Sequence, residues 1–266
     1  MMTYGVPADK IAALVCGAVD QGGIPPVVYR YRAFDEHTDS SLTDGVQYFS
    51  VADAFNDPFD CQIKDSGDFS VTQLFEAVVA MGMPRLQATT VVLHNAKENI
   101  VPKIIEEAKK GAFNRRGILC LSERSESILM WSHYGMDHTG YALGFTVKHD
   151  PHFFASPFRV SYAENYPVYS HITEPQYVVE KGMLTKSIDW TYEREIRVIK
   201  DRVGLISFKK TALTEVILGA RISIQNRDRM VKLLSVPEYD HVTIKQARVS
   251  DTAYRVEIDT VSFPKV

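Results

Sequence analysis

The feature that most constrains the fold is the segment from Trp190 to Ile199, which reads WTYEREIRVI. From Glu193 onward its residues alternate as in a β-strand, where successive side chains point to opposite faces. Glu193, Glu195 and Arg197 would then share one face. Like charges on one strand face are unfavourable unless an opposite charge or a ligand lies nearby. We therefore expect this strand to carry chemistry, with Arg197 holding one carboxylate in its charged form.

Composition and charge are those of an ordinary globular protein. The 266 residues are 45% apolar and 24% charged, which argues against disorder and coiled coils. The net charge of −3 argues against bulk electrostatic binding of nucleic acid, although it leaves room for a local basic groove. The three cysteines are scattered and form no CxxC motif, so we expect neither a disulfide framework nor a metal site.

Targeting signals are not evident in the sequence. Residues 1–20 lack the basic region and the long apolar core of a signal peptide, since Asp9 and Lys10 interrupt the apolar run. No stretch approaches the roughly 18–20 uncharged apolar residues of a membrane span. We expect a cytoplasmic protein with no membrane association, and the sequence leaves its oligomeric state open.

Helices and strands are expected to alternate irregularly along the chain. Strands are expected at 27–32, 46–50, 117–122, 140–147, 158–162, 193–200, 205–208, 215–218, 242–247 and 254–258. Helices are expected at 9–19, 34–42, 128–134, 174–184 and 224–234, and as a broken pair within 69–110. Without a regular βαβ period, this order predicts an α+β protein with a single mixed, largely antiparallel sheet. We expect one domain over 1–266, with a helical insertion at about 69–111.

Two arginines of the expected strand 27–32 form the second candidate site. Arg30 and Arg32 alternate with Tyr29 and Tyr31, so their guanidiniums would share one face. Such a pair is suited to binding phosphate or pyrophosphate. The same arginines could instead pair with acidic residues of the fold, including Glu193 and Glu195, and the sequence does not decide between these alternatives.

Two short segments supply further candidates. The turn FNDPFD at 55–60 contains Asn56, which either stabilises the turn by bonding its own backbone or forms one wall of a pocket. The segment MWSHY at 130–134 contains Trp131, His133 and Tyr134. On a helix, Trp131 and Tyr134 are neighbours, whereas His133 points elsewhere and is more typical of a structural group than of a base.

Five motifs in one order resemble a known family. They are the YRYR strand at 29–32, the FNDPFD turn at 55–60, the block LSERSESILMWSHYGMDHTG at 121–140, the WTYEREIR strand at 190–197 and EVILG at 215–219. Together they resemble the bacterial domain-of-unknown-function family 2971 over residues 27 to about 222. The family name states no function, so the chemistry has to come from the residues.

The layout also resembles, more loosely, ADP-ribosyltransferase-type folds. Those folds place an Arg or His on a first core strand, an aromatic and hydroxyl segment on a second, and a Glu, often within an E-x-E pair, on a later strand. The matching positions here are Arg30 or Arg32, then Tyr48, Phe49 and Ser50, then Glu195 with Glu193. The second strand departs from the family pattern because it lacks a Ser-Thr-Ser triplet.

This second resemblance implies NAD as substrate in an ADP-ribosyltransferase or NAD glycohydrolase reaction. Its pyrophosphate would lie against Arg30 or Arg32 and its nicotinamide against Tyr48 or Phe49. Glu195 would stabilise the positive charge that develops on the ribose, and Glu193 would orient or deprotonate the acceptor. The acceptor would be a nucleic acid or a protein, and the kind of family implies a role in bacterial phage defence or in a toxin system.

Two alternatives stay open at the level of sequence. The first is a metal-dependent nuclease or phosphodiesterase, with Asp57, Asp60, Glu193 and Glu195 around Mg²⁺ and Lys186 beside the phosphate. The second is a module without catalytic activity that senses a nucleotide or a partner protein. Walker A, GxGxxG and GxSxG motifs are absent, which argues against the common nucleotide-binding and hydrolase classes.

Overall fold

The chain forms two compact units in a computed structural model that describes residues 7–80, 82–98 and 101–263. The first unit runs to Ser50, resumes over Gly117–Val160 and continues from Asp189. The second comprises Val51–Arg116 and Ser161–Ile188. The helical segment expected at 69–111 therefore lies in the second unit.

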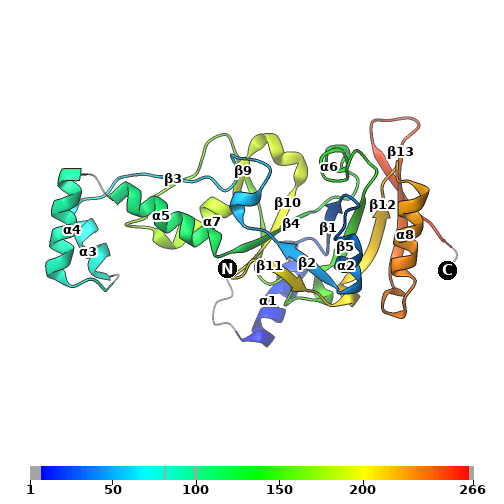
Figure 1. The fold of residues 1–266 in the computed structure, drawn as a ribbon, viewed down its shortest axis with the longest axis horizontal. Helices are drawn as coiled ribbons and strands as arrows, with labels where there is room; N and C mark the ends of the chain where they lie inside the picture. Colours follow the sequence, from blue (N-terminus) through cyan, green and yellow to red (C-terminus); the bar gives the residue numbers. More distant parts are fainter. Residues whose placement is uncertain (1–6, 81, 99–100, 264–266) are drawn as a thin grey trace. The chain divides into compact units, whose positions relative to one another are not determined.

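The first unit is built on an eight-stranded sheet in the order β14-β13-β12-β5-β1-β4-β10-β6 (Figure 1). Its strands are β1 (Val27–Arg32), β4 (Gly117–Ser122), β5 (Tyr141–Thr146), β6 (Pro157–Arg159), β10 (Glu195–Lys200), β12 (Leu213–Leu218), β13 (Thr243–Val249) and β14 (Val256–Thr260). Neighbours are antiparallel except β12 and β13, which are parallel and joined through helix α8 (Ile224–Leu234). The expectation of a mixed, largely antiparallel sheet is confirmed.

Short helices and a second ladder complete this unit. The α-helices are α1 (Ala8–Asp20), α2 (Thr38–Thr43) and α6 (Ile128–His133), and β2 (Val46–Phe49) pairs with β11 (Gly204–Ser207). Single-turn helices are η2 (Val147–His149), η4 (Ile188–Glu193), η5 (Lys210–Ala212) and η6 (Pro237–Tyr239). Helices α6 and α8 begin where serine side chains, Ser127 and Ser223, accept a hydrogen bond from a backbone N–H of the first turn.

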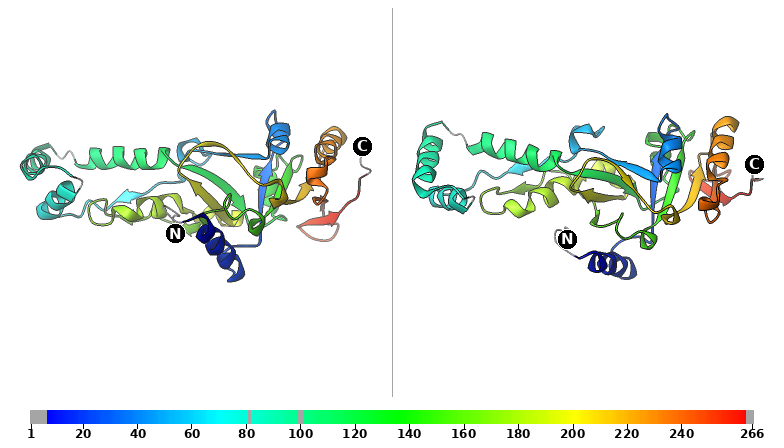
Figure 2. Two further views of the ribbon diagram at one scale, coloured as in Figure 1. Left: turned by 90° about the horizontal axis from the view of Figure 1, so that it is seen from below. Right: turned by 60° about the horizontal axis from the view of Figure 1, so that its bottom comes forward.

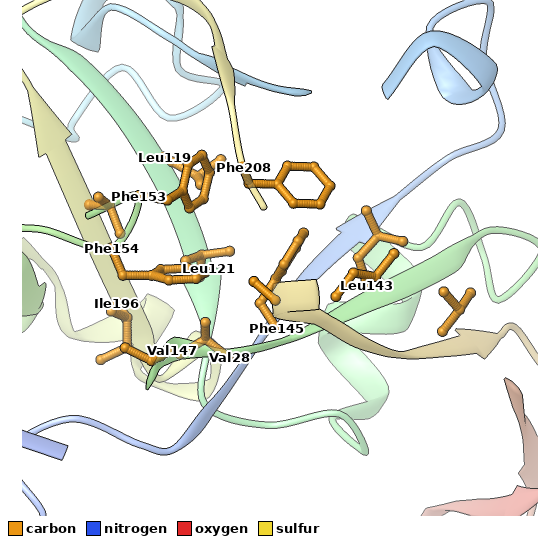
Figure 3. Close-up of a cluster of buried hydrophobic side chains, with 14 of the residues drawn as sticks. Val28, Leu119, Leu121, Leu143, Phe145, Val147, Phe153, Phe154, Ile196 and Phe208 are labelled. Atoms are coloured by element: carbon orange, nitrogen blue, oxygen red, sulfur yellow. The ribbon is translucent and has the colours of Figure 1, made fainter. Parts of the chain in front are cut away.

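One face of the sheet carries the main hydrophobic core. Alternate residues of adjacent strands, such as Val28, Leu121, Leu143 and Ile196, point into it (Figure 3). Phenylalanines from the loops beyond the strands close the core, and Phe153 meets Phe208 with ring centroids 5.8 Å apart. This core holds the strands in the register that places Glu195 and Arg197 on the opposite face.

Helix α6 covers part of the opposite face. Trp131 is fully buried there, packs edge-on against Tyr31 at 5.1 Å, and donates its indole N–H to the carbonyl of Ser125 at 2.8 Å. Ala142 and Ile217 complete this smaller apolar cluster. Trp131 is therefore a core residue that fixes α6 on the sheet.

The second unit is mainly helical. It contains α3 (Val71–Ala80), α4 (Arg85–Glu98), α5 (Val101–Asn114) and α7 (Val178–Met183), with η1 (Ala52–Ala54) and η3 (Pro175–Tyr177). Helices α3 and α4 lie side by side (Figure 2). Two short parallel ladders join β3 (Lys64–Asp65) to β8 (Val168–Tyr169) and β7 (Ser161–Ala163) to β9 (Thr185–Ser187). Among the described residues, none of the helices is long and apolar enough to cross a membrane.

Three expectations about the elements need correction. The strand expected at 158–162 is interrupted between β6 and β7, which belong to different units. The helix expected at 34–42 starts only at Thr38, after a turn in which Asp35 accepts from the N–H of His37. The strand expected from Glu193 starts at Glu195, for a reason that concerns the site itself.

Candidate functional site

Glu193 and Glu195 are separated by a turn, so the expectation that both lie on one strand face is wrong. Glu193 ends helix η4, and the N–H of Arg194 donates to the carbonyl of Thr191 at 3.2 Å. Arg194 then adopts φ +47°, in the left-handed region that few non-glycine residues occupy. Strand alternation begins only at Glu195. Both carboxylates are nevertheless buried, at 3% exposure for Glu193 and 5% for Glu195.

Glu195 forms a buried bidentate ion pair with Arg197. The Arg197 Nε donates to one carboxylate oxygen at 2.8 Å and Nη2 donates to the other at 3.0 Å. The strand register places these residues beside Ser122 and Cys120 of β4. Burial, followed by the negative charge of Glu195, raises the pKa of the Cys120 thiol well above its ordinary value. The same-face placement of Glu195 and Arg197 is as expected from the sequence.

Glu193 is held from two neighbouring elements. The hydroxyl of Tyr134, just after α6, donates to its carboxylate at 2.6 Å. The hydroxyl of Ser122 donates to its backbone carbonyl at 2.6 Å. The Tyr134 bond therefore orients the carboxylate, and the Ser122 bond holds the backbone that carries it.

Four rings near Glu193 in the sequence or in space contact one another, and we call His133, Tyr134, Trp190 and Tyr192 the aromatic cluster; Tyr134 joins it to Glu193. His133 Nδ1 and the Tyr192 hydroxyl are 2.8 Å apart and share a hydrogen bond. Trp190 lies 6.2 Å from His133 and 5.8 Å from Tyr192, measured between ring centroids. His133 is exposed and the other three rings are half-buried. The cluster therefore joins α6 to η4 and presents ring surface to solvent.

The two arginines of β1 do not form the expected fork opposite the carboxylates. Cα pairing of Tyr29 with Ser122, and of Ser122 with Glu195, places Tyr29 on the same face as Glu195. Arg30 and Arg32 leave the strand on the other face by alternation. Arg32 pairs there with Asp35 at 2.9 Å.

Arg30 fills a gap between two strands. β1 pairs with β5 over six residues but with β4 at a single Cα pair. In this opening the Arg30 Nη1 donates to the carbonyl of Cys120 at 2.5 Å, while its Nε is buried without a partner. Burial lowers the pKa of the guanidinium from its ordinary value. Arg30 therefore acts as a bridge in the sheet as well as a nearby positive charge for Glu195.

The remaining predicted residues are dispersed. Tyr48 is exposed on β2, whereas Phe49 is fully buried in the main core, where its ring meets Phe153 at 5.6 Å. Ser50 forms a backbone bridge to Ile118. Asn56 is exposed on a turn of the second unit, and Glu193 belongs to the first.

Glu215 lies on the same sheet face as Tyr29 and Glu195, and it was not among the candidates from the sequence. Glu215 of β12 is buried and bonds Lys245, while its Oε1 has no partner. It lies across Gly144, where an added Cβ would come within 2.4 Å of the Glu215 Cγ. Burial, followed by Glu215, raises the pKa of Tyr29 far above its ordinary value. The sequence could have indicated Glu215 only through its position opposite Gly144. That pairing can be recognised only when the order of the strands is known.

The residues considered for Mg²⁺ do not form a ligand set in the described part of the chain. There, no group of three or more His, Cys, Asp or Glu side chains is arranged to hold an ion. Of the residues considered for Mg²⁺ and phosphate, Asp60 and Lys186 instead pair with each other at 3.5 Å in the second unit.

Comparison with known proteins gives one match. A family model described as "Protein of unknown function (DUF2971)" matches residues 130–198, which span α6, β5 and the strand with Glu195 and Arg197. No curated protein and no solved structure matches the chain. The matched residues 130–198 contain Glu193, Glu195 and the aromatic cluster, and over them the chain is similar to the DUF2971 family, as its motifs predict.

Proposed function

We propose that the chain is an NAD-consuming enzyme of the ADP-ribosyltransferase or NAD glycohydrolase type, with Glu193 as the catalytic carboxylate. The observation that carries this proposal is a buried carboxylate hydrogen-bonded by Tyr134, one ring of a partly exposed aromatic cluster. Aromatic faces and a fixed carboxylate both favour positive charge. A site of this kind suits a reaction whose transition state gains positive charge.

Cleavage of the bond between nicotinamide and ribose is such a reaction. The bonding electrons leave with nicotinamide, the ribose becomes cationic, and an acceptor oxygen or nitrogen then bonds to it and loses a proton. Glu193 would lie beside that charge, and its position is fixed before the reaction by Tyr134. A preorganised group of this kind is typically worth about 2.7–4 kcal/mol of the barrier.

The geometry favours Glu193 over Glu195 for this role. Both oxygens of Glu195 accept from Arg197, so its charge is largely compensated. Glu195 is better suited to positioning the strand that follows Glu193. Arg30 bridges two strands and Arg32 is paired with Asp35, so both arginines would have a structural role. The substrate would instead contact the aromatic cluster.

The test is release of nicotinamide from labelled NAD by the full chain. Glu193→Gln keeps the shape of the side chain and should lower the rate about a hundredfold or more. Tyr134→Phe removes only the orienting hydroxyl and should lower it less. Glu36→Gln is the matched control, since that side chain is 86% exposed, and its rate should equal that of the wild type.

Two outcomes would overturn the proposal. One is equal release by the wild type and Glu193→Gln, with circular dichroism showing both folded. The other is no release by the wild type in water or with protein, RNA or DNA acceptors. If NAD raised the melting temperature without turnover, the chain would be a sensing module rather than an enzyme.

A further inference from the structure

A pocket in the second unit has two exposed aromatic rings in its wall. It has a volume of about 240 Å³, and Phe59 and Tyr166 contribute to its lining with exposures of 64% and 48%. Exposed rings at the mouth of a concave site are more informative than isolated surface aromatics, because they offer flat surfaces to a ligand.

Tight turns hold the backbone beside both rings. The N–H of Phe59 donates to Asp57 Oδ1 at 2.9 Å, and Cys61, two residues later, adopts φ +54°. Tyr166 precedes Pro167, whose carbonyl accepts from the N–H of Lys64 at 2.9 Å beside the β3–β8 ladder. The backbone that carries the two rings therefore has little freedom to lose when a ligand binds.

Apart from Ala163 and Pro167, the rest of the pocket wall is polar. The amides of Gln62 and Asn165 and the hydroxyls of Thr185 and Ser187 line it. The lysine at its base, Lys186, is paired with Asp60 at 3.5 Å. Glu164 also lines the pocket and adds negative charge, so the site is unsuited to anchoring a phosphate.

We propose that this pocket binds one nucleobase, stacked on Phe59 or Tyr166 and read along its edge by the amides and hydroxyls. Stacking on aromatic side chains, with hydrogen bonds from amides to the base edge, is how proteins bind unpaired bases. A phenyl or indole ring of a peptide would make little use of these amides and hydroxyls, because it carries at most one hydrogen-bonding group. The volume is below the roughly 300–1,000 Å³ of sites for larger ligands, which suits a single base.

The base could belong to a free nucleoside or to a single-stranded nucleic acid, and the experiment separates these sources. Isothermal titration of the full chain would use adenosine, guanosine, cytidine and uridine singly, and then a mixed-sequence twelve-nucleotide RNA. Tighter binding of a nucleoside indicates a free ligand, and tighter binding of the RNA indicates a strand. Either result supports the pocket only if the variants below weaken it.

Phe59→Ala and Tyr166→Ala should each weaken binding, and the ring that stacks on the base should cost about 5- to 150-fold. Both side chains are exposed, so the melting temperature of each variant should equal that of the wild type. Tyr254→Ala, at a fully exposed tyrosine of the other unit, should bind as the wild type does. Glu193→Gln should also bind normally, which separates this site from the proposed enzyme activity.

Three results would overturn the inference. They are no binding of any nucleoside or of the RNA at millimolar concentration, binding that neither alanine variant weakens, and tighter binding of N-acetyltryptophanamide than of every nucleoside. The last result would identify the pocket as a site for an aromatic side chain of a peptide.

Discussion

Arg197→Met should destabilise the first unit strongly, because it leaves the buried Glu195 carboxylate without its main counter-ion. The two side chains are 0% and 4% exposed, so solvent screens the loss poorly. Removing one partner of such a pair typically costs about 3–5 kcal/mol. Arg30 interacts electrostatically with Glu195 and compensates part of the charge, so we expect the lower value, about 3 kcal/mol.

A double-mutant cycle measures this effect directly. Combining Arg197→Met with Glu195→Gln removes both charges and should recover part of the stability, giving a coupling energy of about 1–3 kcal/mol. Urea unfolding followed by tryptophan fluorescence is the appropriate assay, since both tryptophans of the chain, Trp131 and Trp190, lie in the first unit. In thermal unfolding, the single variant should melt about 6–12 °C below the wild type.

The control is an arginine of another strand whose ion pairs are exposed. Arg248 of β13 bonds Asp259 and Glu257 at the surface, and Arg248→Met should leave the unfolding midpoint nearly unchanged. The buried ion pair does not stabilise the fold as expected if Arg197→Met unfolds no more readily than Arg248→Met, or if the double-mutant cycle shows no coupling energy.

Other substitutions test the packing and titration of the first unit, with one helix control. Gly144→Ala would place its Cβ within 2.4 Å of the Glu215 Cγ and should cost about 1–3 kcal/mol in urea unfolding. Gly111→Ala, in helix α5 with open space around it, should instead add about 0.5–1 kcal/mol, and equal effects of the two would contradict the packing. Burial lowers the pKa of Lys200 to about 8, below its unfolded value near 10.4. The wild type should therefore gain stability relative to Lys200→Met as the pH rises from about 8 to about 10.4, and parallel pH curves would contradict this.

Elements with a strong local pattern are predictable from the sequence with their bounds. β1, β4 and α8 occupy 27–32, 117–122 and 224–234, the same ranges that the sequence predicts. The two-residue strands β3 and β8 were not predicted, since two residues carry no periodic signal. They exist because distant segments pair at Lys64 and Val168.

At the candidate site, too, some features follow from the local sequence and others depend on contacts between distant segments. The placement of Glu195 and Arg197 on one face follows from period-two spacing, whereas the burial of the pair does not. The turn at Arg194 is not visible in the sequence, because arginine is not typical of positive φ. That turn moves Glu193 off the strand to the hydroxyl of Tyr134.

The sequence by itself determined the mixed, largely antiparallel sheet, the similarity of residues 130–198 to the DUF2971 family, and the placement of Glu195 and Arg197 on one strand face. Only the tertiary structure decided that Arg30 and Arg32 leave β1 on the face away from Glu195, and that Phe49 belongs to the core. The physical reason is that alternation tells which residues of one strand share a face. The pairing of strands far apart in the chain decides which of those faces meet, and that pairing depends on the packing of the whole sheet.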